Sequence, residues 1–317
     1  MIKIPSIVIG SGFGKRVIAN LINKNEKFEL KALVTRSNFK KVNFKKAKII
    51  FLATPPHTHH WWINKIPQGP KIVCEKPLSN NLVNIRKIIQ NKNKILCINH
   101  QLRFSKIIKH LKKINHKDNI KSLKINHQTN HSYIDRRLQG WWSSNSKGGG
   151  QVFALGSHFI DLITFIFGKI KIIECKSSTL RSVKKNISED YIELKIKTFS
   201  NCEVSIKSNS FTKKKEVLNI DTITKSGKNY TSNNLKDLML KNKSIVISEK
   251  QYKDPFINAN LWRVCFFNFL DNLFKNIKNK KNNKTKTFCD LNDAIYNQRI
   301  MMACLKSNKI KKPIKLK

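Results

Sequence analysis

The chain has 317 residues, 40% of them hydrophobic, so it can bury a substantial core and is expected to form two domains. Its first residues lack the apolar run of a signal peptide, and no apolar stretch reaches the length of a membrane span. The seven cysteines form no C-x-x-C pair and are expected to be reduced. These features predict a cytoplasmic globular protein without a membrane partner.

The charge is strongly positive, since 63 Lys and Arg face 19 Asp and Glu, which gives +44. Such a surplus usually indicates nucleic acid as a partner. Here lysine is spread through nearly the whole chain, and the densest runs, Lys278–Lys286 and Lys309–Lys317, contain no aromatic side chain for bases to stack on. We therefore expect no nucleic-acid partner, and we expect the charge to favour anionic ligands such as phosphorylated cofactors or acidic sugars.

The first predicted element is a strand over Pro5–Ile9, followed by Gly10-Ser11-Gly12-Phe13-Gly14 and by helical spacing over 15–22. Strand, glycine turn and helix are the context of a dinucleotide-binding fingerprint. Gly10 would permit the tight turn, and Gly12 would let the backbone approach a pyrophosphate at the helix N-terminus. The third glycine of G-x-G-x-x-G is replaced by Lys15, so an ordinary strand-to-helix turn is the alternative.

The second predicted strand, Phe28–Val34, ends at Thr35-Arg36-Ser37. Folds that bind NAD usually carry an acidic residue here, which bonds the ribose 2′-hydroxyl. A hydroxyl and a guanidinium without a carboxylate suit a 2′-phosphate, so the sequence favours NADP over NAD. The alternative is that Arg36 is one more cation in a basic chain.

The third predicted strand, over 47–53, is hydrophobic throughout, as strands buried on both faces are. It leads into Thr54-Pro55-Pro56-His57-Thr58-His59-His60. Three histidines in four residues resemble a metal site, but no cysteine or carboxylate follows at ligand spacing, so no metal is expected. We interpret the segment as a loop that lines a cofactor cleft.

The fourth predicted strand, Lys71–Cys74, runs into Glu75-Lys76-Pro77, and a fifth covers Ile95–Asn99. Because ligands bind at the carboxyl ends of parallel strands, the ammonium of Lys76 would lie beside a cofactor. A surface ion pair with Glu75 is the plainer alternative. The alternation of strands and helices predicts a Rossmann-like, doubly wound parallel sheet over residues 1–118.

Residues 119–317 show a different pattern and predict an α+β domain with a large mixed or antiparallel sheet. Several strand candidates lie between 169 and 248, and helices are predicted over 151–167, 255–277 and 291–305. The last of these helices is a candidate to pack back on the first domain. The loop before the first of these helices contains Arg136, Arg137, Trp141 and Trp142, which with Arg103 are candidate substrate contacts.

Several of these motifs occur together in one order, which is more specific than any one of them. They are Gly10-Ser-Gly-Phe-Gly-Lys-Arg-Val, Ala53-Thr-Pro-Pro with His59, Cys74-Glu-Lys-Pro-Leu, Arg103-Phe104, Gly140-Trp-Trp, and Gly148-Gly-Gly through Gly156-Ser-His-Phe-Ile-Asp-Leu. In this the chain resembles the Gfo/Idh/MocA family of glucose-fructose oxidoreductase and inositol dehydrogenase relatives. The resemblance covers nearly the whole chain.

The resemblance implies nicotinamide-dependent oxidation or reduction of a sugar, cyclitol or related polyol derivative. It implies that Lys76 lies near the substrate hydroxyl, oriented by Glu75, and that His158 is the general acid and base. It also implies association of identical chains through the second domain's sheet. The predicted cofactor contacts are Gly10, Gly12, Phe13, Gly14, Thr35, Arg36, Thr54, Pro55, His59 and Glu75. The predicted substrate contacts are Arg103, Trp142 and Asp161.

One position departs from the family pattern. Many members carry an aspartate four residues before the histidine, and this chain has Ala154 there. Its absence leaves Lys76 and His158 without that carboxylate. A catalytically silent protein that binds cofactor and ligand to regulate partners is therefore the alternative.

Overall fold

The computed structural model describes residues 2–129, 140–180, 188–212, 216–247, 252–278 and 287–316. The chain forms two compact units, one of residues 1–104 and 251–295 and the other of residues 105–250 and 296–317. These units differ from the predicted ranges 1–118 and 119–317. Helix α4 (Lys106–Asp118) buries its apolar face in the second unit, and the segment from 251 returns to the first.

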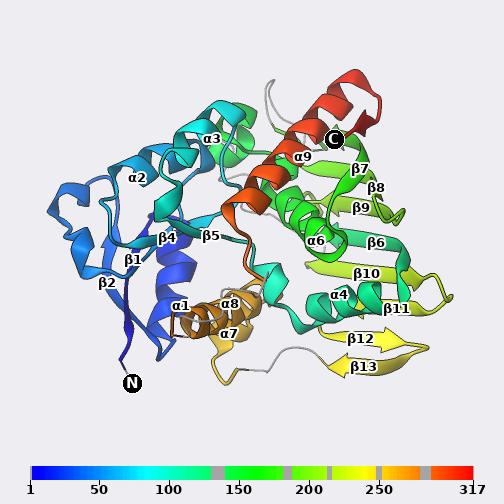
Figure 1. The fold of residues 1–317 in the computed structure, drawn as a ribbon, viewed down its shortest axis with the longest axis horizontal. Coiled ribbons are helices and arrows are strands. Elements are labelled where there is room, and N and C mark those ends of the chain that lie inside the picture. Colours follow the sequence, from blue (N-terminus) through cyan, green and yellow to red (C-terminus); the bar gives the residue numbers. More distant parts are fainter. Residues whose placement is uncertain are drawn as a thin grey trace. The chain divides into compact units, whose positions relative to one another are not determined.

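The first unit contains a five-stranded sheet in the order β2-β1-β3-β4-β5, in which every neighbouring pair is parallel (Figure 1). This confirms the predicted doubly wound sheet. Its strands are β1 (Ile4–Ile9), β2 (Phe28–Val34), β3 (Ile49–Leu52), β4 (Lys71–Glu75) and β5 (Ile95–Asn99).

Helices cover both faces of this sheet, because alternate side chains of each strand point to opposite sides. One core cluster joins Val8 and Phe51 to α1 (Ala19–Asn23) and α8 (Leu261–Lys278). The other joins Ile7 and Ile50 to α2 (His59–Lys65) and α3 (Leu82–Ile89). The short helix α7 (Pro255–Asn258) precedes α8 and contributes Ile257 to the first cluster.

Helix α8 is held in the first unit by aromatic packing. The ring centroids of Phe274 and Phe28 lie 6.4 Å apart. Those of Phe266 and Phe51 are also 6.4 Å apart. Phe269 has no exposed surface, and its ring lies 5.2 Å from that of Phe104. A helical pattern in the sequence identifies the apolar face of α8 but not the sheet that this face covers. The predicted range 119–317 therefore assigns α8 to the second domain.

The second unit contains a nine-stranded mixed sheet in the order β13-β12-β11-β10-β6-β9-β8-β7-β14, in which only β6 and β9 pair in parallel. This confirms the predicted large mixed sheet. Its strands are β6 (Ile120–Gln128), β7 (Ile170–Ser178), β8 (Tyr191–Thr198), β9 (Glu203–Asn209), β10 (Val217–Thr224), β11 (Asn229–Asn233), β12 (Asp237–Leu240), β13 (Lys243–Ile247) and β14 (Ile314–Lys315).

The central helix of this unit begins with a π-helical turn, Val152–Gly156, and continues as α6 (Ser157–Phe167). It packs against the inner face of the sheet, where the rings of Phe159 and His127 lie 5.3 Å apart. Asn145–Phe167 is long and apolar enough to cross a membrane, yet 89% of its apolar window is buried within the fold. Such burial is typical of a core helix. The last long helix, α9 (Leu291–Ile310), begins in the first unit and ends in the second.

We expect Phe269→Ala to lower the free energy of unfolding by about 3–5 kcal/mol, because it leaves a cavity among the aromatic rings of the first unit. Urea unfolding followed by circular dichroism measures this loss. Phe199→Ala, at a side chain that is 53% exposed, is the control and should change stability little. A loss below about 1 kcal/mol for Phe269→Ala would contradict the packing of α8 in this core.

Candidate active site

The glycine turn after β1 is fixed by close packing against the end of β3. Gly10 has a φ of +137°, and a Cβ there would lie 2.2 Å from the carbonyl oxygen of Ala53. Its N–H donates to the carbonyl of Val34 at the end of β2, at 2.9 Å. Gly10 therefore joins the carboxyl ends of three strands, and no other residue type fits there.

The next two glycines have different surroundings. A Cβ on Gly14 would lie 3.2 Å from the side chains of Ala53 and Val8, so Gly14 supplies the close helix–strand packing for which the third fingerprint glycine is known. This explains why an exposed Lys15 is tolerated at the usual position.

A Cβ on Gly12, by contrast, would meet no atom within 4 Å. That open space lies at the start of a helix, whose first N–H groups and positive dipole end favour an anion. Phe13, between the two, is 41% exposed. The turn therefore fits a pyrophosphate, and the predicted cofactor contacts of Gly10, Gly12, Phe13 and Gly14 stay predictions.

The loop after β3 is held by a buried histidine. His59 has no exposed surface, and burial is the main reason that its pKa falls to about 4. Its Nε2 lies 2.8 Å from the carbonyl oxygen of Thr54, and its Nδ1 lies 3.1 Å from that of Leu78. A neutral imidazole has one N–H, so only one of the two carbonyls accepts from it, and the thiol of Cys74 also lies 3.4 Å from Nδ1.

His59 therefore ties the loop after β3 to the loop after β4. The hydroxyl of Thr58 closes the loop after β3 on itself, since it lies 2.9 Å from the hydroxyl of Thr54 and 2.7 Å from the carbonyl of Pro55. The structure gives His59 this structural task. Its predicted contact with the cofactor, and those of Thr54 and Pro55, stay predictions.

Glu75 and Lys76 follow at the carboxyl end of β4. The side chain of Glu75 is nearly buried and accepts a 2.5 Å hydrogen bond from Nδ2 of Asn99, its register partner on β5. Burial raises the pKa of Glu75 to about 7, against the opposing effects of Asn99 and of the Lys76 charge. Lys76 is half-buried and precedes a cis proline, Pro77. Glu75 is thus poised to change charge near neutral pH, directly beside Lys76.

Arg103 lies in the turn after β5, in the first unit. Its side chain is 2% exposed, and its Nη1 lies 2.8 Å from Oδ2 of Asp293. The charge is therefore compensated within the fold. Its predicted substrate contact stays a prediction, while Arg136 and Arg137 lie outside the described residues.

In the second unit, His158 and Asp161 lie on α6 and are 4% and 1% exposed. Asp161 accepts a hydrogen bond from Nδ2 of Asn297 on α9, at 2.8 Å. The Oδ1 of that amide accepts in turn from the hydroxyl of Thr164, at 2.9 Å. The carboxylate of Asp161 is thus held by a neutral donor from α9. Ala154, in the π-helical turn before α6, is buried.

The glycine run before this helix is required by two close approaches. A Cβ on Gly149 would lie 2.3 Å from the carbonyl oxygens of Trp141 and Trp142, and one on Gly150 would lie 2.6 Å from the carboxylate of Glu189. That carboxylate accepts from the N–H of Val152 at 3.1 Å. Glu189 therefore stabilises the start of the helix that carries His158.

The motifs in the sequence do not identify Glu189 or Asn297. Each lies far along the chain from its partner and belongs to no motif. The run Gly148-Gly149-Gly150 is the signal in the sequence that something approaches closely at this turn. Trp142, a predicted substrate contact, is half-buried, and its carbonyl accepts from the N–H of Gly150 and the hydroxyl of Ser188. That predicted contact also stays a prediction.

A glycine turn at the carboxyl edge of a parallel sheet, followed by a large mixed sheet, defines a two-unit protein with a dinucleotide-binding fold. The model of the Gfo/Idh/MocA oxidoreductase family, C-terminal alpha/beta domain, matches residues 114–316. The chain belongs to this family, which confirms the resemblance found in the sequence.

Two curated relatives are similar to parts of the chain. An oxidoreductase named cns1 from Cordyceps militaris is 31% identical over 131 residues, which make up 38% of this chain and 16% of the relative. An uncharacterized oxidoreductase of Schizosaccharomyces pombe is 26% identical over 157 residues, 46% of this chain and 41% of the relative. The matches thus span less than half of either relative.

Solved structures share the fold over nearly the whole chain. The WlbA dehydrogenase from Bordetella pertussis, in complex with NADH and UDP-GlcNAcA, is 16% identical with a TM-score of 0.78 and covers 99% of this chain and 98% of its own. A myo-inositol dehydrogenase from Corynebacterium glutamicum is 15% identical with a TM-score of 0.75 and covers 100% and 99%. Gal80p from Saccharomyces cerevisiae, crystallised as a super-repressor mutant, is 14% identical with a TM-score of 0.78 and covers 99% and 98%. At these identities the likeness shows the fold.

We expect Glu75→Gln to stabilise the protein relative to the wild type as the pH rises. Burial raises the pKa of Glu75 from 4.5 to about 7, so the folded state holds this proton more tightly than the unfolded state does. The associated stability is present below pH 4.5 and is lost as the pH passes through about 7. The glutamine keeps an acceptor for Asn99 and does not ionise.

Urea unfolding at pH 5 and pH 8 tests this. The free energy of unfolding of Glu75→Gln, relative to that of the wild type, should rise by about 2–3 kcal/mol from pH 5 to pH 8. This follows from about 1.36 kcal/mol for each pKa unit. Glu26→Gln, at an exposed carboxylate, is the matched control and should show no such growth. An equal difference at both pH values would show that Glu75 titrates as an ordinary carboxylate.

Proposed function

We propose that the protein is an NAD(P)-dependent oxidoreductase that transfers a hydride between a nicotinamide and a hydroxyl or keto carbon of a sugar, cyclitol or related polyol derivative. The observation that carries this proposal is the turn at Gly10 and Gly12, closed by Ala53 on one side and open on the other. Membership of an oxidoreductase family and the presence of Lys76 at the end of β4 support it.

In this proposal the bound dinucleotide supplies the hydride chemistry, and the chain supplies placement, charge and a proton carrier. The ammonium of Lys76 stabilises negative charge that develops on the substrate oxygen. The imidazole of His158 takes up the hydroxyl proton or returns it, a task that suits the pKa of histidine. Glu75 orients Lys76, and Asp161, held by Asn297, stiffens the helix that carries His158.

The proposed substrate class rests on chemistry and on relatives. WlbA was solved with a UDP-linked sugar acid, and the inositol dehydrogenase is named for a cyclitol. The net charge of +44 supports an anionic sugar derivative. We propose Arg103, Trp142 and Asp161 as substrate-side residues and a cytoplasmic location. For the cofactor we propose NADP over NAD, because Thr35 and Arg36 follow β2 where a carboxylate would select NAD.

A second candidate function is a catalytically silent protein that binds cofactor and ligand. Two observations favour it, namely Ala154 in place of the aspartate of many family members and the likeness of the fold to Gal80p, a protein crystallised as a repressor mutant. This candidate predicts that dinucleotide binds without turnover across a broad panel of sugars. Nicotinamide absorbance with free and nucleotide-linked sugars distinguishes the two functions.

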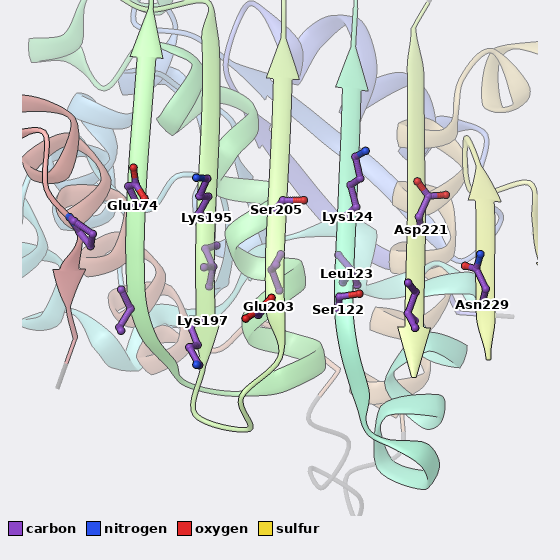
Figure 2. Close-up of a pocket in the computed structure, with 15 residues that line it drawn as sticks. Ser122, Leu123, Lys124, Glu174, Lys195, Lys197, Glu203, Ser205, Asp221 and Asn229 are labelled. Carbon is purple, nitrogen blue, oxygen red and sulfur yellow. The ribbon is translucent and has the colours of Figure 1, made fainter. Parts of the chain in front are cut away.

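We also propose that identical chains associate through the outer face of the second unit's sheet. This face forms a shallow hollow of about 670 Å³ crossed by rows of charged side chains from neighbouring strands (Figure 2). Its lining contains three lysines and three acidic residues, which are Lys124, Lys195, Lys197, Glu174, Glu203 and Asp221. In a chain with 63 cations and 19 acidic residues, a hollow whose lining carries no net charge lets two copies meet with less repulsion.

We expect Lys76→Ala and His158→Ala to lower kcat by about 10²- to 10⁴-fold while leaving the Kd for dinucleotide within a few-fold, since each acts on the reacting oxygen. Steady-state kinetics and calorimetry measure the two quantities. Lys71→Ala, at the opposite end of β4, and His116→Ala, on the exposed side of α4, are the controls. Unchanged turnover in either active-site variant would reject that residue's role.

We expect Ser205→Lys to dissociate the assembly. Ser205 is in register with Lys124 on β6 and with Lys195 on β8, so the variant places three cations in one row of the shared face. Sedimentation at micromolar concentration should show an oligomeric wild type and a monomeric variant. Ser146→Lys, in an exposed turn, adds the same charge elsewhere and should leave the oligomer intact. A wild type that sediments as a monomer would overturn this proposal.

A further inference from the structure

The turn after β2 is organised by a single amide side chain. Oδ1 of Asn38 accepts from the backbone N–H of Thr35 at 2.7 Å and from its hydroxyl at 3.3 Å. Nδ2 of the same residue donates to the carbonyl of Leu33 at 2.9 Å. The amide thus bonds to the backbone of both Leu33 and Thr35, at the end of the strand. These bonds close residues 35–38 into a fixed loop.

The residue that follows is anchored as well. The ring of Phe39 lies 5.6 Å from that of Phe44, 5.8 Å from that of Trp61 and 5.3 Å from that of Trp62. Trp62 is buried in the core under α2. The Asn38 amide thus ties the backbone after Arg36 to the sheet, and the aromatic cluster around Phe39 ties it to α2.

Arg36 itself is left for another partner. Its side chain is exposed and forms no salt bridge or hydrogen bond with any residue that the structure describes. The hydroxyls of Thr35 and Ser37, on either side of it, lie 2.8 Å apart. From 35 to 48 the chain has five lysines and no acidic residue, so the loop offers one guanidinium, paired hydroxyls and further cations to an anion.

The loop also adjoins the glycine turn. Val34, the last residue before it, accepts the hydrogen bond of Gly10. A phosphorylated ribose whose pyrophosphate lies at Gly12 would reach this edge of the sheet, where dinucleotide folds hold the adenosine ribose.

We infer that Asn38 is a positioning residue that holds the Arg36 turn in the conformation that receives the 2′-phosphate of NADP, and that it thereby sets the preference for NADP over NAD. The inference rests on the proposed function. A fixed turn spares the complex the entropy of ordering Arg36 at binding. NAD lacks the 2′-phosphate, so a preordered Arg36 does not strengthen its binding. The affinity for NAD should therefore not depend on Asn38.

Calorimetric titration of the 317-residue chain with NADP and with NAD tests this inference. We expect Asn38→Ala to weaken NADP binding by about ten-fold and NAD binding by less than about two-fold, as loss of a preformed charged contact would. Arg36→Ala should lower the same ratio further. Asn43→Ala removes a comparable side-chain bond, to the N–H of Lys45 at 3.0 Å in the next turn, and should leave the ratio unchanged.

Asn38→Asp is a second variant, in case the alanine variant is poorly folded. It retains the acceptor for Thr35, loses the donor to Leu33 and adds a negative charge, so it should turn the preference toward NAD. A wild type that prefers NADP, with Asn38 variants that keep this preference, would overturn the inference alone. A wild type that binds neither dinucleotide would overturn the proposed function with it.

Discussion

The close approach of Gly10 to the end of β3 is the constraint on which the dinucleotide-binding edge depends. With a carbonyl oxygen 2.2 Å from the place of a Cβ, and with its N–H bonded to Val34, Gly10 draws the ends of β1, β2 and β3 together. The loops that follow these strands therefore share one edge of the sheet. His59 extends the same edge to the loop after β4, because it contacts the carbonyls of Thr54 and Leu78. The loops after β1, β2, β3 and β4, which have little sequence in common, therefore lie together at one edge of the sheet.

Acidic residues are scarce in this chain, and three of the buried ones are held by neutral donors. Asn99 donates to Glu75, Asn297 donates to Asp161, and a backbone N–H donates to Glu189. At Glu75 the neutral donor stabilises the buried carboxylate less than a cation would, so burial still raises its pKa. For Glu75 the result is a pKa of about 7. A lysine or arginine in place of Asn99 would have fixed the negative charge and removed that sensitivity.

Local patterns in the sequence predicted the elements well and the long-range contacts poorly. The bounds of β2 and β5 match their predicted ranges, because apolar runs between polar turns define short strands. The sequence could not show that α8 covers the parallel sheet, because its phenylalanines would suit any apolar face. It predicted residue types at strand ends, such as Arg36 and Lys76. It did not predict the amides of Asn38, Asn99 and Asn297 that hold such residues, since an asparagine has no distinctive pattern until its partner is known.

The helix that carries His158 is specified on several sides in spite of Ala154. Glu189 stabilises its start, Gly149 and Gly150 permit the approach of their neighbours, and Asn297 holds Asp161 one turn after the histidine. A buried carboxylate at position 154 would need a hydrogen-bond donor of its own, and alanine removes that need at a site that is 3% exposed. Asp161 already has a donor in Asn297. Under the proposed function, the imidazole of His158 would then carry the proton without a carboxylate at position 154.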